Sequence, residues 1–98
     1  MIVRIVKLEF KKENISSFER IFDTTKDKIR SFEGCSLLEL YQDTHEPSIF
    51  FTYSQWESEE YLEAYRNSDF FKEVWSKTKG LFADKPAAWS VQKVHSLN

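Results

Sequence analysis

The sequence predicts an α+β fold in which a four-stranded antiparallel sheet carries helices on one face, with the elements in the order β-α-β-β-α-β. Two observations predict this order. Apolar segments of strand character alternate with longer segments of helical periodicity, and turn-forming residues at 43–48 separate two strand-like segments directly. At 98 residues the chain has the usual size of one domain, so we expect a single domain over residues 1–98.

The first predicted strand covers residues 2–11 and is apolar on both of its faces. Alternation places Val3 and Ile5 on one face, and the other face carries Ile2, Val6, Leu8 and Phe10. Because both faces are apolar, we expect this strand to be buried on both sides.

A helix is predicted to follow, from Ile15 to Phe32. Asn14 stands where an N-cap residue is expected, and Gly34 is the expected end because glycine readily adopts a left-handed backbone. The apolar stripe of this helix recurs at steps of three and four residues and consists of Ile15, Phe18, Phe22, Thr25, Ile29 and Phe32.

The next two strands, residues 35–43 and 49–56, are predicted to form a hairpin. The turn between them contains Pro47, which cannot donate a hydrogen bond to a strand ladder. Side chains alternate along the second of these strands, with Phe51 and Tyr53 on one face and Thr52, Ser54 and Trp56 on the other.

A second helical region is predicted from Ser58 to Phe82. Ser58 is the expected N-cap, and the carboxylates that follow it lie where the helix dipole is positive. We expect a break at residues 66–69, where Asn67 or Ser68 can cap a second helix.

The last predicted strand covers residues 87–95, after the boundary that Pro86 marks. The complete order is that of the split βαβ, ferredoxin-like fold, with the helices on one face of the sheet. Aromatic and aliphatic side chains are also predicted on the other face, so that face needs a cover. A second copy of the chain is the simplest cover.

Charge and composition exclude several classes of function. The net charge is −2, from 14 basic and 16 acidic residues, and no basic cluster is interleaved with aromatic residues, so nucleic acid is not an expected partner. Charged residues interrupt the apolar run at residues 1–7, so neither a signal peptide nor a membrane span is expected. The single cysteine, Cys35, fits a reducing compartment, and we expect a cytoplasmic protein.

Residues that carry metal, phosphate or nucleophilic chemistry stand alone in this sequence. His45 and His95 have no Cys or His at ligand spacing, and the two glycines cannot build a phosphate-binding loop. Cys35 lies at the start of a strand with no motif around it, which is typical of a buried core residue. We therefore expect neither a metal nor an organic cofactor.

The remaining signal is a set of aromatic side chains with polar neighbours. A cavity between sheet and helices would have aromatic walls and few polar groups, which is typical of a site for a flat hydrophobic ligand. The alternative is that the rings only fill the core. The rings are Tyr53, Trp56, Tyr65, Phe71, Trp75 and Trp89, and the polar neighbours are Thr52, Ser54, Arg66 and Asn67.

Several segments together resemble one known family. They are the opening strand and the segments Phe32–Cys35, Phe51–Tyr61, Asn67–Phe71 and Leu81–Ala83. This pattern resembles the antibiotic biosynthesis monooxygenase (ABM) family of the dimeric α/β-barrel superfamily. The resemblance implies a ferredoxin-like protomer that dimerises sheet to sheet. It also implies oxidation of polycyclic phenols or quinols by molecular oxygen, without metal or flavin, with the substrate between sheet and helices.

The chain departs from this family at several functional positions. In a related branch that degrades haem, an Asn, a Trp and a His stand where this chain has Val6, Tyr65 and Trp75, so we do not expect haem degradation. The positions that correspond to the Trp, the Tyr and the Asn of the quinone-forming enzymes are Trp56, Tyr61 and Thr52. Where many members carry a Glu or His residues, this chain has Ser54, Tyr65 and Phe70.

Two functions remain open. The first is a cofactor-independent monooxygenase that oxidises an aromatic or quinol-like small molecule with O₂, with Trp56, Tyr61 and Thr52 as its catalytic residues. Its expected substrate-binding residues are Tyr53, Ser54, Tyr65, Phe71, Trp75 and Trp89. The second is a non-catalytic homodimeric module that binds a small hydrophobic ligand, which the lack of an evident general base favours.

Overall fold

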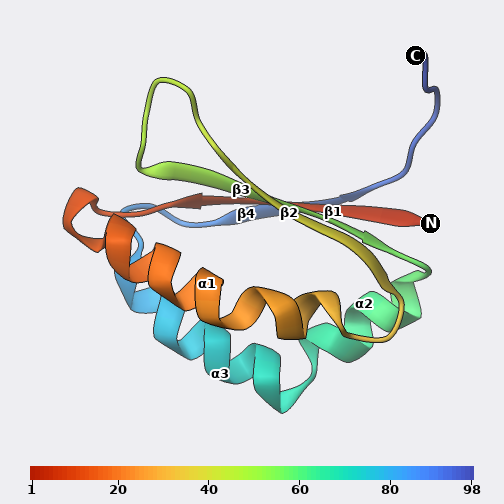
Figure 1. Ribbon diagram of the computed structural model, residues 1–98, viewed down its shortest axis with the longest axis horizontal. Coiled ribbons are helices and arrows are strands. Elements are labelled where there is room, and N and C mark those ends of the chain that lie inside the picture. Colours follow the sequence, from red (N-terminus) through yellow and green to blue (C-terminus); the bar gives the residue numbers. More distant parts are fainter.

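Four strands form one antiparallel sheet, and the helices cover only one of its faces (Figure 1). The computed structural model describes all residues, 1–98. The strands are β1 (Ile2–Glu9), β2 (Cys35–Gln42), β3 (Ile49–Trp56) and β4 (Ala87–Val91). The helices are α1 (Ile15–Arg30), α2 (Glu59–Arg66) and α3 (Asp69–Thr78), with short 3-10 turns η1 (Lys12–Asn14) and η2 (Lys79–Leu81). This order confirms the predicted ferredoxin-like α+β fold.

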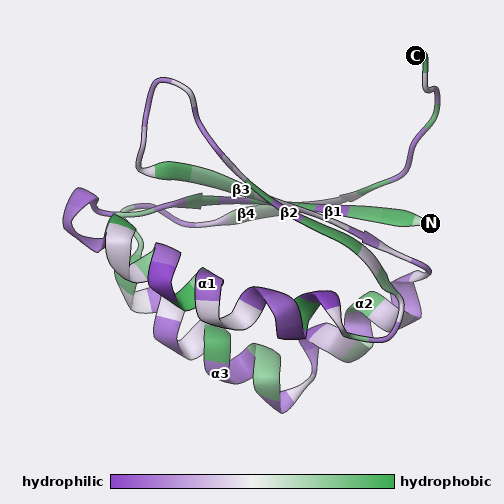
Figure 2. Ribbon diagram, in the orientation of Figure 1, coloured by the Kyte–Doolittle hydropathy of each residue, from purple (hydrophilic) through white to green (hydrophobic).

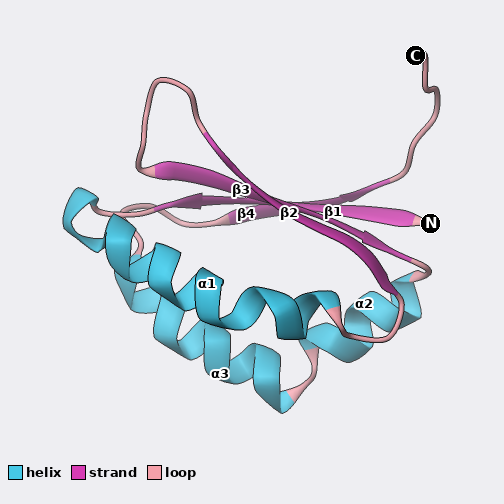
Figure 3. Ribbon diagram, viewed as in Figure 1, coloured by secondary structure: helices cyan, strands magenta, loops and turns pink.

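The strand order in the sheet is β2-β3-β1-β4, so the first and third strands lie in the centre. Val6 of β1 lies opposite Thr52 of β3 and Ala88 of β4. Val6 packs against the buried side chains beneath the sheet, so its two neighbours in the ladder also face the helices. Figure 3 shows all three helices on that side.

Two clusters of buried side chains hold the helices against the sheet. One consists of Leu8, Phe10, Phe18 and Phe50, and the other of Cys35, Trp56 and Leu62. In Figure 2 the helices alternate between hydrophilic and hydrophobic residues, as expected when only one side of a helix is buried. Each fully buried ring or aliphatic side chain contributes about 1.5–3 kcal/mol to folding through the area it removes from water. Because the clusters lie at opposite ends of β3, the middle of this layer is free to be hollow.

The other face of the sheet has no cover within the chain. Tyr41, Trp89 and Val91 are 52%, 48% and 43% exposed, far more than core residues of their type. On this face the Tyr41 and Tyr53 rings meet edge to face at 6.4 Å between centroids. An aromatic face that stays in contact with water is the kind of surface that proteins use for association.

The ends of several elements differ from the prediction. β4 ends at Val91 rather than at residue 95, because its only neighbour, β1, begins at Ile2 and Val91 already lies opposite Val3. β1 ends at Glu9, and Phe10 beyond it forms a single bridge to Phe82. Strand ends of this kind depend on the partner strand, which a local pattern does not describe.

Two of the predicted helix caps do not form. Asn14 and Ser58 stand at N-cap positions, but neither side chain accepts a helix N–H. The Asn14 amide instead donates to the Leu81 carbonyl at 3.3 Å. Beside Ser58, the pKa of the Glu60 carboxyl is lowered, chiefly by its own backbone N–H and further by the Ser58 side chain. Ser68 is a true cap, because it accepts the Phe71 N–H at 3.1 Å.

The helices of this fold are amphipathic and short. None of them combines the length and the apolar composition that crossing a membrane would require.

Candidate functional site

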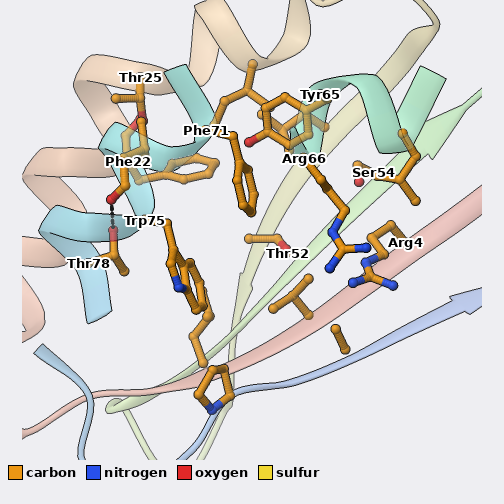
Figure 4. A pocket seen from close by; sticks show the side chains of 18 of the residues that line it. Arg4, Phe22, Thr25, Thr52, Ser54, Tyr65, Arg66, Phe71, Trp75 and Thr78 are labelled. Carbon is orange, nitrogen blue, oxygen red and sulfur yellow. Dashed lines mark hydrogen bonds between the residues drawn. The ribbon is translucent and has the colours of Figure 1, made fainter. Parts of the chain in front are cut away.

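A cavity of about 380 Å³ lies between the sheet and the helices (Figure 4). Its floor is formed by side chains of β1, β2, β3 and β4, and its walls by side chains of the three helices. Of the 22 residues that line it, 15 are hydrophobic. Small-molecule sites in proteins usually measure about 300–1,000 Å³ and are mostly apolar. The cavity therefore has the size and character of a site for one small hydrophobic molecule.

Small side chains in the middle of the sheet create the hollow. On the helix-facing side of β3, Thr52 and Ser54 stand between Phe50 and Trp56, which are 3% and 1% exposed. Ala88 of β4 adds a third small side chain to the floor. Because β3 carries large rings at both ends of this face and hydroxyl-bearing residues between them, space remains where a continuous core would otherwise form.

Aromatic rings form one wall of the cavity in an unbroken series. Trp56 stacks on Tyr65 with centroids 5.1 Å apart, and Tyr65 meets Phe71 edge to face at 5.0 Å. Phe71 and Trp75 are nearly parallel, with 5° between their planes and 6.2 Å between centroids. These rings come from β3, α2 and α3, and the Ser68 cap fixes the start of α3 so that Phe71 and Trp75 lie one turn apart on the same face. Such a wall offers flat surfaces on which a planar ligand can stack.

Some polar groups of the cavity have hydrogen-bond partners within the protein, and others do not. The Trp56 indole N–H donates to the Ser54 hydroxyl at 3.0 Å, and both residues are buried. Trp56 therefore forms a wall of the cavity and is not available as a donor to a ligand. The Thr78 hydroxyl is also occupied, because it donates to the Val74 carbonyl at 2.8 Å.

Tyr65 and Thr52 carry the hydroxyl groups that remain free. Both residues line the cavity, and neither hydroxyl takes part in a hydrogen bond within the protein. No fully buried side-chain nitrogen or oxygen lacks a partner, so these two hydroxyls are open to the cavity. Burial raises the pKa of the Tyr65 phenol, with a smaller contribution from Cys35. The Tyr65 hydroxyl is therefore a neutral donor at physiological pH, and it can hydrogen-bond an oxygen of a ligand.

Two arginines complete the lining at one end. Arg4 of β1 donates to the Ser90 hydroxyl at 3.0 Å, and Arg66 at the end of α2 pairs with Glu63 at 2.9 Å. Burial lowers the pKa of the Arg4 guanidinium, and repulsion from Arg66 lowers it further. In Figure 4 the two guanidinium groups lie close to each other at the edge of the cavity.

Three of the expected site residues lie away from the cavity. Tyr53 and Trp89 are both opposite Ile5 in the sheet ladder, so they lie on the uncovered face. Tyr61 packs against Gly34 instead, where an added Cβ would overlap its ring. Residues that alternate along a strand cannot share one face, and this separates Tyr53 from Thr52 and Ser54.

The other six expected residues line the cavity together: Thr52, Ser54, Trp56, Tyr65, Phe71 and Trp75. Sequence reasoning missed Arg4, which lines the cavity although it lies in an apolar strand. The signal was present, because Arg4 is in phase with Val6 and Leu8 on the face that was expected to be buried. The side chains of α1 that line the cavity include Phe22 and Thr25. Both belong to the apolar stripe that was predicted for this helix.

The fold and the cavity together define a ferredoxin-like α+β protein with a ligand-sized, aromatic-walled space between sheet and helices. The family model described as Antibiotic biosynthesis monooxygenase matches residues 1–76, and the chain belongs to that family. This membership confirms the family that the sequence resembles.

Solved structures support the same fold. One similar structure is a conserved protein from Methanosarcina mazei Go1, with 23% identity, a TM-score of 0.88, and coverage of 95% of this chain and 93% of that chain. Another is an antibiotic biosynthesis monooxygenase, with 17% identity, a TM-score of 0.90, and coverage of 97% and 100%. A protein from Pseudomonas aeruginosa has 19% identity, a TM-score of 0.85, and coverage of 96% and 94%. No curated protein matches the chain in sequence.

Proposed function

We propose that this protein is a monooxygenase that binds a flat phenol-like or quinol-like molecule in the cavity and oxidises it with O₂. The observation that carries the proposal is the unbroken series of rings from Trp56 to Trp75 along a cavity of about 380 Å³. Membership of the antibiotic biosynthesis monooxygenase family supports the type of reaction.

With an anthrone as substrate, the proposed reaction converts the methylene group between the aromatic rings into a carbonyl group. With a hydroquinone, a ring C–H becomes C–OH and the ring is oxidised to a hydroxyquinone. One oxygen atom of O₂ enters the product and the other leaves as water, so the substrate supplies both electrons and both protons that this water requires. Once deprotonated, such a substrate is electron-rich enough to reduce O₂ directly. The protein then has to orient the ring, exclude water and stabilise negative charge on a substrate oxygen.

Residues of the cavity fit these tasks in distinct ways. Phe71 and Trp75 would provide stacking surfaces, and the Tyr65 hydroxyl, which lines the same cavity, would donate to an oxygen of the substrate. Thr52 supplies a second hydroxyl from the floor. Trp56 acts through its position, because its N–H is already bonded to Ser54.

A second function is favoured by the acid-base character of the lining. No carboxylate and no imidazole lies among the residues that line the cavity. A module that binds an aromatic ligand without converting it needs no such base, whereas the monooxygenase depends on a substrate that is acidic enough to lose its proton to solvent.

Oxygen uptake by the purified protein separates these functions. We expect anthrones or hydroquinones to cause O₂ consumption above the protein-free background, with one O₂ used per substrate. Thr52→Leu should reduce this rate at least tenfold, because the larger side chain fills the floor of the cavity, whereas Thr24→Leu on the exposed side of α1 should not.

The contrary result would be background oxygen uptake with every compound of the panel. If calorimetry then detected tight binding of the same compounds, and Thr52→Leu abolished that binding, the protein would be a binding module. Absence of both turnover and binding would contradict both functions.

We also propose that the protein acts as a homodimer whose protomers cover each other's open sheet face. The exposure of Tyr41, Trp89 and Val91 on that face supports this assembly. It would place the Tyr53 and Trp89 rings in the interface between protomers.

A further inference from the structure

Two positively charged groups stand side by side at one end of an otherwise apolar cavity. Arg4 comes from the central strand β1, and Arg66 is the last residue of α2. Both line the same cavity, and Figure 4 shows their guanidinium groups next to each other, pointing to the same region. A pair of like charges in this position needs a reason, because each repels the other and because Arg4, although not Arg66, is partly buried.

The protein neutralises this pair only in part. Its ion pairs are Lys26–Asp23, Arg66–Glu63 and Lys77–Glu73. Arg4 therefore has no carboxylate within ion-pair distance, and its hydrogen-bond partner is the neutral Ser90 hydroxyl. The carboxylates of Glu59 and Glu63 act on Arg4 from a greater distance, and neither residue lines the cavity. The charged groups that the cavity presents to a ligand are thus the two guanidinium groups alone.

The rest of the cavity determines what kind of anion could lie there. The aromatic wall runs from Trp56, near these arginines, to Trp75 at the other end. A free inorganic anion would leave this apolar space unfilled, whereas an uncharged ring system would leave Arg4 without a charged partner. A carboxylate attached to a planar ring system satisfies both, because guanidinium groups bind carboxylates through parallel hydrogen bonds.

We propose that the ligand of this cavity is an aromatic carboxylic acid, with its carboxylate between Arg4 and Arg66 and its rings along Phe71 and Trp75. This inference rests on the proposed function and narrows its substrate to acidic aromatic compounds. It also fixes the direction in which the ligand lies in the cavity.

The test is a pair of probes that differ in charge and have nearly the same shape. Binding of 2-naphthoate and 2-naphthamide is measured by isothermal titration calorimetry at low salt. We expect naphthoate to bind at least about tenfold more tightly, since hydrogen bonds to charged partners are stronger than neutral ones. Added salt should weaken naphthoate binding and leave naphthamide binding nearly unchanged.

Variants then assign the preference to the two arginines. Arg4→Met and Arg66→Met should each remove most of the preference for naphthoate while naphthamide still binds. Arg20→Met is the matched control, because Arg20 is exposed on α1 and does not line the cavity. Circular dichroism checks the fold of each variant. If Arg4→Met does not fold, Arg66→Met and the salt dependence of the native protein decide the question.

The results distinguish this inference from the proposed function. If both probes bind equally, or if Arg66→Met keeps the full preference, the inference of an acidic ligand is wrong. The proposed function is then not contradicted, because the cavity still binds an aromatic compound. If neither probe binds, the cavity does not accept planar rings, and the proposed function falls with the inference.

Discussion

Ser54 shows how one small residue shapes the cavity and supports its wall. Its hydroxyl accepts the Trp56 indole N–H at 3.0 Å in a site where both residues are buried. The same residue leaves room for a ligand because its side chain is short. Many family members carry a glutamate at the position of Ser54. In this fold, the serine holds the Trp56 ring in place through a hydrogen bond.

Ser54→Ala is expected to lower the free energy of unfolding by about 1–3 kcal/mol, because it leaves a buried indole N–H without a partner. Urea unfolding followed by tryptophan fluorescence measures this. The double variant Ser54→Ala with Trp56→Phe should lose less stability than the sum of the losses in the two single variants, since it removes donor and acceptor together. Strict additivity would show that the hydrogen bond does not contribute.

Tyr65 makes stability depend on pH in the alkaline range. Burial raises the pKa of its phenol above the unfolded value of about 10, so the unfolded chain loses this proton first as the pH rises. The contribution of the Tyr65 phenol to the free energy of unfolding is fully present below a pH of about 10 and is lost as the pH rises above it. We expect the native protein to lose more stability between pH 8 and pH 10.5 than Tyr65→Phe does, in urea unfolding at both pH values. Equal losses would contradict this assignment.

Residue types and alternation explain why six of the 22 residues that line the cavity were expected from the sequence as site residues. Thr52, Ser54 and Trp56 share a face of one strand, and Phe71 and Trp75 share a face of one helix. Arg4 was missed because a charged residue inside an apolar strand is usually assigned to solvent. Its placement follows from the ladder, which puts Arg4 opposite Ser54 and Ser90.

At the scale of elements, Gly34 joins the end of α1 to β2 and fixes how α2 lies against them. Its backbone has a φ of 87°, which favours glycine, and an added Cβ would overlap the Tyr61 ring. The Gly34 carbonyl also accepts the Glu57 N–H at 2.7 Å. This close approach explains why Tyr61 packs beside Gly34 and not in the cavity.

Gly34→Ala is expected to destabilise the protein by at least about 2 kcal/mol, because strain at positive φ adds to the overlap with Tyr61. Gly80→Ala is the matched control, since nothing lies within 4 Å of the position of its added Cβ. Thermal unfolding compares them, and Tyr61→Ala should recover part of the loss in the Gly34→Ala background. A Gly34→Ala protein as stable as Gly80→Ala would refute this account of the junction.

Helix and strand types were predictable because their periodicities are strong and local. The ends were less predictable, because β4 stops where its neighbour does and the Ser58 side chain does not cap α2. Such endings depend on the partner that the fold supplies.

At the scale of the whole molecule, the sheet has one covered and one open face. The covered face holds the core and the cavity, and the open face exposes Tyr41, Trp89 and Val91. The proposed homodimer would remove this surface from water; stable interfaces of this kind usually bury about 800 Å² on each partner. The single domain over residues 1–98 remains a prediction, since the family model matches residues 1–76.

Trp89→Glu is expected to convert the dimer into a single chain in solution, because an unpaired carboxylate would be buried in the interface. Sedimentation equilibrium reports the mass, and Lys79→Glu, which is exposed at the helix layer, is the control. Ligand binding in the cavity should persist in the variant, since Trp89 does not line it. A native protein that sediments as one chain would contradict the dimer itself.

The sequence by itself determined the element order, the two-sided apolar first strand, the family and most of the aromatic lining, because these depend on local periodicity and residue type. Only the tertiary structure decided which rings meet. It placed Tyr53 and Trp89 on the open face, held Tyr61 against Gly34, and brought Arg4 beside Arg66. These relations depend on strand register and on the close approach of distant segments, and both are set by how the sheet and helices pack together.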